Sequence, residues 1–167
     1  VLRNLEKGES VVTDEVTGLV WQHCPAGLSG VDCDVGNAID SYNWSEALAY
    51  CDNLVWGNYS DWYLPNEFEL QSIVDYRRAN PAIDTSVFSE VVSGLFYSST
   101  TSAINSDYVR MVNFSNGRIL WETKSGVATA RHIRCVRRGG AVTTDEGNRF
   151  VRKMHDSASV VIDKATN

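Results

Sequence analysis

Four cysteines carry the chemistry that this sequence could most readily perform. They are Cys24, Cys33, Cys51 and Cys135. No C-x-x-C spacing is present, and the three histidines, at positions 23, 132 and 155, do not complete a zinc-ligand set with them. Two disulfides fit better: one from Cys24 to Cys33 would close a short glycine-rich loop, and one from Cys51 to Cys135 would tie an early helix to a late strand. Such bonds indicate an oxidising compartment. Four unpaired buried thiols in a cytosolic protein are the alternative.

Nucleophilic catalysis would need a thiolate activated by a neighbouring base. His23 lies next to Cys24 and is the one such neighbour. Adjacent residues on a strand point to opposite faces, so adjacency in sequence is weak support for contact. No other catalytic signature is present, and we therefore predict neither enzymatic activity nor a cofactor.

Side-chain oxygens gather in the Gly-, Ser- and Asp-rich loop of residues 23–42. They belong to Asp32, Asp34, Asn37 and Asp40. Calcium takes six to eight oxygen ligands, but the glycine and the closing glutamate of an EF-hand loop are misplaced here. A polar loop braced by a disulfide is the favoured interpretation, and no metal site is predicted.

Aromatic and polar side chains that suit ligand binding cluster on the late strands and the tip of their hairpin. They are Tyr97, Tyr108, Arg110, Asn113, Asn116, Arg118, Trp121 and Glu122. Aromatic rings and arginines on a surface suit sugar rings or protein partners. The alternative is that Tyr97 and Trp121 belong to the core and the other six are ordinary solvated residues.

Length and charge limit the possible functions. The 167 residues predict one domain, and 21 acidic against 15 basic residues give a net charge of −6. This argues against nucleic-acid binding, and it weakens the case for an anionic polysaccharide unless basic residues cluster. Four arginines do crowd residues 131–138, where we expect a solvated strand face. No apolar run approaches the roughly 20 residues that span a bilayer, so no membrane insertion is predicted.

Two capped helices form the centre of the predicted scaffold. Asn43 with Glu46, and Asn66 with Glu69, have the spacing of capping boxes. Helical spacing predicts an apolar stripe on the first helix at Trp44, Ala47, Leu48, Cys51, Leu54 and Val55. The second helix is expected to bury Phe68, Leu70, Ile73 and Val74.

Strand patterns flank these helices. Residues 10–22 predict a hairpin that turns at Gly18, and residues 95–100 predict a short strand. Residues 108–124 are the clearest hairpin, with a turn at Asn116-Gly117, and residues 132–138 are expected to be the last strand. The stretch between the second helix and residue 95 is expected to be irregular, anchored by Ile83, Val87 and Phe88.

The end of the chain repeats its beginning. Val160-Val161-Ile162-Asp163 aligns with Val11-Val12-Thr13-Asp14 at a constant offset of 149, and Arg152 and Ser159 align with Arg3 and Ser10 without a gap. We therefore predict a module over residues 1–138, a linker over 139–148 and the truncated start of a second copy over 149–167. Chance similarity between two hairpins is the alternative. The opening without Met favours a fragment of a longer protein.

Six segments in order carry a resemblance to a known family: VTDEVTGLVWQ, NWSEALAYC, SDWYLPNEFELQSIVD, PAID, FYSST and IRCVRR. Together they resemble the bacterial family typified by the C-terminal domain of the Legionella collagen-like adhesin. The resemblance covers about residues 10–138. It implies an α+β, C-type-lectin-like fold, with two helices packed on short antiparallel sheets and long irregular loops. It also implies an exported bacterial protein that is extracellular, attached to the cell surface or periplasmic.

The function implied by the resemblance is adhesion to sulfated glycosaminoglycans, from which this chain departs in net charge. The E-P-N, Q-P-D and W-N-D motifs of calcium-dependent lectins are also absent, and Asn66 in Leu64-Pro65-Asn66 is better explained as a helix cap. Two functions stand: a surface module that binds glycan or glycosaminoglycan, or a structural or protein-binding repeat of a larger cell-envelope protein. No oligomeric state is predicted.

Overall fold

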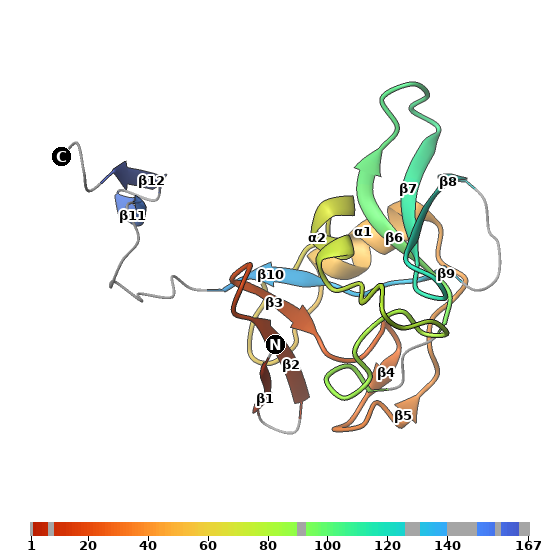
Figure 1. Ribbon diagram of the computed structural model, residues 1–167, viewed down its shortest axis with the longest axis horizontal. Coiled ribbons are helices and arrows are strands. Elements are labelled where there is room, and N and C mark those ends of the chain that lie inside the picture. Colours follow the sequence, from red (N-terminus) through yellow and green to blue (C-terminus); the bar gives the residue numbers. More distant parts are fainter. Residues whose placement is uncertain are drawn as a thin grey trace.

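The computed structural model describes residues 2–6, 9–89, 93–125, 131–139, 150–155 and 158–163 (Figure 1). The first four-stranded sheet has the order β1-β2-β3-β10, formed by Leu2–Glu6, Glu9–Asp14, Leu19–Gln22 and Val136–Arg138. The second has the order β8-β7-β6-β9, formed by Arg118–Thr123, Tyr108–Asn113, Leu95–Thr101 and Arg131–His132. With two helices, this is the predicted α+β architecture.

Two small antiparallel sheets complete the described strands. β4, Leu28–Ser29, lies inside the loop that the Cys24–Cys33 disulfide closes, and it pairs with β5, Val35–Gly36, which follows that loop. β11, Phe150–His155, pairs with β12, Ala158–Asp163, near the end of the chain. The predicted linker over 139–148 lies, except for Gly139, outside the described residues.

Both helices begin at the predicted caps. Asn43 precedes α1, Trp44–Asp52, and Asn66 precedes α2, Glu67–Ser72, and each asparagine forms a reciprocal capping box with the glutamate three residues later. Both helices contact β6, and α2 also contacts β7 (Figure 1). The caps therefore fix where each helix starts against the second sheet.

Two of the predicted core positions are wrong. Val55 is exposed because α1 ends at Asp52, so helical spacing no longer applies there. Phe68 is exposed because α2 turns Glu67 and Leu70 inward instead. Glu67 is buried with polar partners. Its backbone N–H donates to Thr100 Oγ1 at 2.9 Å, and its carboxylate forms an ion pair with Arg110.

Among the residues whose burial is described, the core consists of two clusters separated by the central strands. Val11, Tyr97 and Met111 belong to one cluster, together with the disulfide of Cys51. The other contains residues from the same strands, including Val12, Trp21, Phe96 and Val112, and also Ile83 and Phe88 from the irregular stretch. Because successive strand residues point to opposite faces, β2, β6 and β7 each contribute to both clusters.

The two predicted hairpins are present, but one turn differs from expectation. Gly18, with φ of 71°, is the last residue of the turn between β2 and β3, as predicted. The β7–β8 loop spans residues 114–117 rather than a two-residue Asn116-Gly117 turn, and of these residues Gly117 alone has positive φ. Asn113 Oδ1 accepts from Ser115 N–H at 2.8 Å, which favours this longer loop.

The prediction of one last strand over residues 132–138 is wrong. β9 ends at His132 and lies parallel to β6, whereas β10 begins at Val136 and pairs antiparallel with β3. The residues between them cross from one sheet to the other. Ala26 N–H donates to Ile133 O and Gln22 N–H to Cys135 O, both at 2.9 Å, so the crossing segment is bonded along its length. We call residues 131–138 the crossing segment.

Both predicted disulfides are present. Cys24 pairs with Cys33 across 9 residues, and Cys51 pairs with Cys135 across 84 residues. The second bond joins α1 to the crossing segment, and both of its sulfur-bearing residues are fully buried.

Loss of the long-range disulfide should destabilise the fold more than loss of the local one. In the loop-entropy description, Cys51→Ala with Cys135→Ala removes about 4–5 kcal/mol, and Cys24→Ala with Cys33→Ala about 3 kcal/mol. Equilibrium urea unfolding of the two double variants measures the difference. Equal losses would show that loop length does not set the contribution of these bonds.

Candidate functional site

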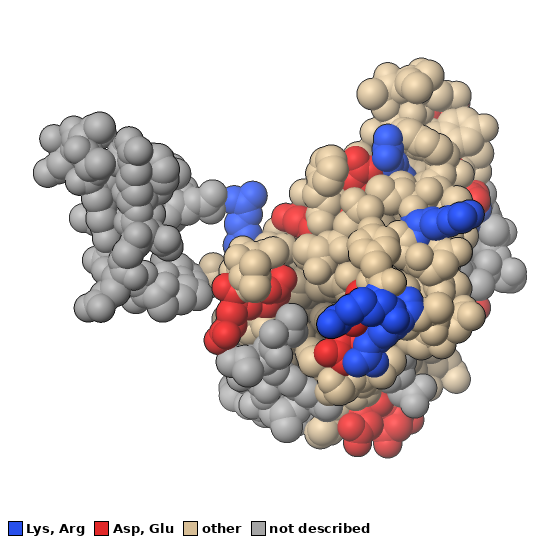
Figure 2. Space-filling model, viewed as in Figure 1, with Lys and Arg blue, Asp and Glu red and all other residues tan. Residues whose placement is uncertain are grey.

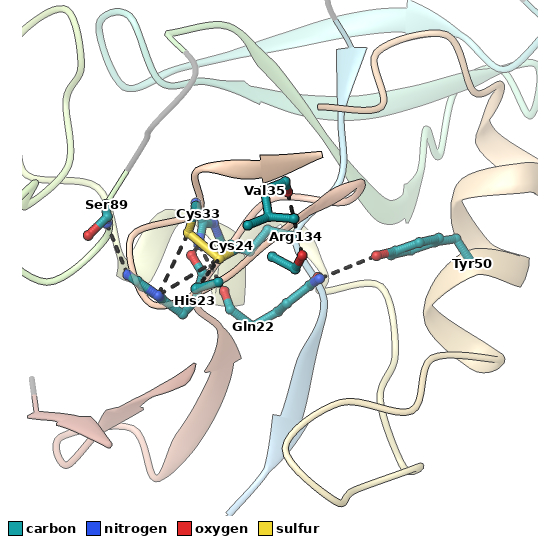
Figure 3. Close-up of a disulfide and its surroundings, with 10 residues drawn as sticks. Gln22, His23, Cys24, Cys33, Val35, Tyr50, Ser89 and Arg134 are labelled. Atoms are coloured by element: carbon teal, nitrogen blue, oxygen red, sulfur yellow. Dashed lines mark hydrogen bonds between the residues drawn. A yellow bond between two sulfur atoms is a disulfide. The ribbon is translucent and has the colours of Figure 1, made fainter. Parts of the chain in front are cut away.

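His23 and the Cys24–Cys33 disulfide form the one group of three or more His, Cys, Asp or Glu residues that the described chain brings within metal-binding distance (Figure 3). His23 Nδ1 lies 3.7 Å from Cys33 Sγ and 3.9 Å from Cys24 Sγ. On the other side of the ring, Nε2 accepts from the backbone N–H of Ser89 at 3.1 Å. All three side chains are buried.

This arrangement fits a structural role rather than catalysis or metal binding. Because Nε2 accepts a hydrogen bond, the neutral ring carries its proton on Nδ1, which faces the two sulfur atoms. Both sulfurs are already bonded to each other, so neither is available as a thiolate nucleophile or a metal ligand while the disulfide is intact. His23 therefore links the disulfide loop to the segment at Ser89.

The side chains of the oxygen-rich loop lie at the surface. Asp32, Asp34, Asn37 and Asp40 are all exposed. None of the three aspartates belongs to a group of three potential metal ligands among the described residues. The backbone carbonyl of Asp40 instead accepts from Arg131 N–H at 3.2 Å.

The predicted ligand-binding residues divide between the two faces of the β7–β8 hairpin. Arg110 stands opposite Trp121 in the strand register, and Tyr108 lies two residues before Arg110 on the same face. Asn113 stands opposite Arg118 on the other face. The eight residues therefore cannot form a single surface, because side chains alternate along each strand.

Tyr108, Arg110 and Trp121 form a partly exposed group, which we call the aromatic platform. The Arg110 guanidinium lies 4.1 Å from the centroid of the Trp121 ring. Trp121 is 43% exposed and Tyr108 is 37% exposed. Trp121 is thus on the surface rather than in the core.

Sequence reasoning missed the residue that orients this platform. Glu67, at the start of α2, places Oε2 2.9 Å from Arg110 Nε, and Glu67 is itself buried. The guanidinium is therefore held between a buried carboxylate and an indole face. No sequence signal joins Glu67 to Arg110, because the pair depends on how α2 packs on β7.

The inclusion of Tyr97 as a ligand-binding residue is wrong. Its side chain is fully buried, and its hydroxyl accepts from Arg131 Nη1 at 3.2 Å. Glu122 also has a structural partner, since its Oε2 accepts from Arg131 Nη2 at 2.8 Å. Arg131 therefore binds two of the eight predicted residues and ties them to the crossing segment.

The other predicted residues lie at the end of the hairpin. Asn113 and Asn116 accept backbone N–H groups within the loop, from Ser115 and Arg118 respectively. Both side chains shape the turn. Arg118 is exposed.

The expectation that the arginines of residues 131–138 form a solvated face is wrong for three of the four. Arg131 and Arg134 are buried, and Arg137 stacks 3.8 Å from the Tyr59 ring centroid while pairing with Asp61 at 2.6 Å. Only Arg138 is exposed. The crossing segment runs through the interior, which a charge count cannot reveal.

Arg134 is a buried cation that contacts backbone carbonyl oxygens and aromatic rings. It donates to the carbonyl oxygens of Gln22, at 2.8 Å, and His23, and it lies 4.7 Å from the Phe88 ring centroid. Burial lowers the pKa of Arg134 to about 9. Through these bonds Arg134 joins the crossing segment to the end of β3, immediately before the first disulfide.

His132 is the second buried titratable group of the crossing segment. Its ring lies 5.4 Å from the Phe96 ring centroid. Burial lowers the pKa of His132 below its ordinary value of 6.5, and the charge of Asp40 opposes this only in part. The folded protein therefore favours the neutral ring.

Comparison with known proteins gives the family. Residues 10–137 match the Lcl C-terminal domain family. The chain belongs to this family. None of the curated proteins compared with the chain matches it. Within the described residues, every helix is too short or too polar to cross a bilayer. Disulfides persist in oxidising compartments, so the two found here fit the extracellular location expected for an adhesin domain of this family.

The burial of His132 predicts a loss of stability on mild acidification. The unfolded chain takes up a proton near pH 6.5 and the folded chain resists it, so the free energy of unfolding falls as pH drops from 7 to 5. A His132→Phe variant, measured by urea unfolding across this range, should show a shallower fall. The other two histidines are common to both proteins, so superimposable pH profiles would contradict this role for His132.

Proposed function

We propose that the chain is an exported, non-enzymatic binding module that recognises a glycan through the aromatic platform. The observation that carries this proposal is the exposed Trp121 ring with the Arg110 guanidinium stacked on it. An indole face suits the apolar face of a sugar ring, and a guanidinium suits its hydroxyl or acidic groups.

The platform is supported as a binding site should be. Arg110 is held by an ion pair with the buried Glu67, and β8 is anchored through the pair between Glu122 and Arg131. A side chain that is already held loses little conformational entropy when it meets a ligand. This preorganisation distinguishes the platform from exposed aromatics such as Tyr76 and Phe68, which lie outside the hairpin.

The charge distribution favours a neutral or weakly acidic glycan over a heavily sulfated one. The chain carries a net charge of −6. On the face drawn in Figure 2, Lys and Arg form separate small groups with Asp and Glu between them, rather than one continuous basic surface. A sulfated polymer would need several arginines within one binding surface.

A C-type-lectin-like fold is part of the same proposal. The order of a first hairpin, two helices, a long irregular stretch and a late sheet supports it, as does the disulfide from α1 to the crossing segment. Recognition by lectin-type calcium coordination is not proposed, because Asn66 is occupied as the cap of α2.

A second candidate is a structural or protein-binding repeat of a larger cell-envelope protein. It is favoured by the hairpin β11–β12, which has the strand pairing of β1–β2 at an offset of 149 residues.

Removal of the indole should abolish most of the glycan binding. A glycan array carrying neutral and sulfated sugars, with and without calcium, identifies the ligand, and titration then compares variants. Trp121→Ala is expected to weaken binding at least about tenfold, because stacking and cation–π contacts are both lost. Tyr76→Ala, which removes an exposed aromatic outside the platform, is the matched control. Silence across the array, or equal effects of the two substitutions, would overturn the proposal.

The non-enzymatic proposal has a separate test. If both disulfides are permanent braces, thiol titration of the native protein finds no reactive cysteine, before or after incubation with a mild reductant such as glutathione. Rapid reduction of the Cys24–Cys33 bond under native conditions would instead favour thiol chemistry at His23.

A further inference from the structure

The first and last described hairpins have the same strand pairing. In β1–β2, Leu2 stands opposite Thr13 and Asn4 opposite Val11. In β11–β12, Val151 stands opposite Ile162 and Lys153 opposite Val160, each pair shifted by 149 residues. The bounds of β12 are those of β2 plus the same 149. The sequence repeat is therefore also a repeat of structure.

Three of the residues that the two hairpins share are buried in the first hairpin. Val11, Val12 and Asp14 are buried, and identical residues occupy the three positions 149 further on. Glu15 and Val16 are exposed, Val16 to 93%, and the positions 149 residues further on hold different residues, Lys164 and Ala165.

The sequence of the turn after β2 also recurs in part. Asp14 accepts from Val16 N–H at 2.9 Å and from Thr17 Oγ1 at 2.8 Å, and Asp163 and Thr166 keep this spacing. Gly18 has φ of 71°, and nothing lies within 4 Å of the position where a Cβ would stand. Asn167 occupies the equivalent position, and asparagine is the non-glycine residue that best tolerates this conformation.

The edge of β3 is the surface that such a hairpin fits. β2 pairs with β3 at four positions, and it places Val11 in one core cluster and Val12 in the other. Among the described residues, β12 pairs with β11 alone. Its second edge therefore corresponds to the edge by which β2 binds β3.

The end of the first module lies near the place where a replacement hairpin would start. β10 runs antiparallel to β3 and ends at Arg138 opposite Leu19, and Gly139 N–H donates to Gly18 O at 2.9 Å. β1 starts at the same end of the sheet, three strand spacings away, or roughly 14 Å. The ten residues between Gly139 and Phe150 can span roughly 33 Å when extended.

We propose that β11–β12 is a spare first hairpin, which can replace β1–β2 on the edge of β3 within the same chain. The resident hairpin is joined to β3 by the turn of residues 15–18, so it has the shorter loop and occupies the edge in the unmodified chain. Weakening β2 should shift the edge to β12, with Val160 and Val161 in the places of Val11 and Val12. This proposal is independent of the glycan-binding proposal.

Aspartate substitutions in the full chain test the exchange. Val12→Asp places a carboxylate in the core, yet we expect a folded monomer because the spare hairpin takes over. Val161→Asp alone should leave the unfolding constant within about twofold of that of the unmodified chain. The double variant, Val12→Asp with Val161→Asp, should have an unfolding constant at least about a hundredfold above that of Val12→Asp. Val12→Asp with Ala165→Asp is the matched control, since Ala165 aligns with the exposed Val16, and it should behave as Val12→Asp alone.

Limited trypsin digestion gives a second readout. Cleavage should move from Arg152 and Lys153 in the unmodified chain to Arg3 in the Val12→Asp variant, because the displaced hairpin is the one that is exposed. Three results would overturn the proposal: unfolding of Val12→Asp by itself, additive effects of the two aspartates, or a rescue that depends on protein concentration in light scattering. The last would assign the exchange to a second copy of the chain.

Discussion

The structure depends on the crossing segment, which passes through the interior from one sheet to the other. It contributes β9 to the second sheet and β10 to the first, and between them Cys135 is bonded to α1. Burying this stretch requires partners for its polar groups, and neighbouring backbone supplies them. Gln22 and Ala26 donate to its carbonyls, and the Arg134 guanidinium donates to the carbonyl oxygens of Gln22 and His23, at the end of β3. The cost of burying a guanidinium away from water is offset by these bonds and by the rings of Phe88 and Phe96. The disulfide then holds the segment where those partners can reach it.

Local chemistry made much of the fold predictable. The capping boxes at Asn43 and Asn66 need only residues three positions apart, and both form as expected. The two hairpins follow from alternation and turn residues, and the disulfide pairing follows from loop and element positions. Each of these features is decided within a short stretch, or by the few ways that four cysteines can pair.

Several of the failures result from tertiary contacts, and the others from local features that were not applied to these residues. Arg134 is invisible as a core residue because its charge is compensated by carbonyls more than a hundred residues away. Residues 132–138 read as one strand because alternation continues through them, although two sheets share them. The predicted binding residues were gathered by proximity in sequence, but strand alternation sends Arg110 and Trp121 to one face and Asn113 and Arg118 to the other. The support that Glu67 gives to Arg110 depends on the packing of α2, which no local pattern encodes.

The aromatic platform depends on the same crossing segment. β8 is an edge strand, and an edge strand that presents a binding face needs support beyond its single partner. Arg131 supplies this support. From β9, at one edge of the sheet, it donates to Glu122 and to the backbone carbonyl of Thr123, both on β8 at the opposite edge. The second support, Glu67, follows a segment in which Tyr63 exchanges two backbone hydrogen bonds with Val136, at 2.8 and 3.0 Å. Both supports of the platform, the Arg131–Glu122 pair and Glu67, are therefore connected to the crossing segment, residues 131–138. Stability and recognition are linked in this chain because the stretch that joins the two sheets also positions the surface proposed to bind the ligand.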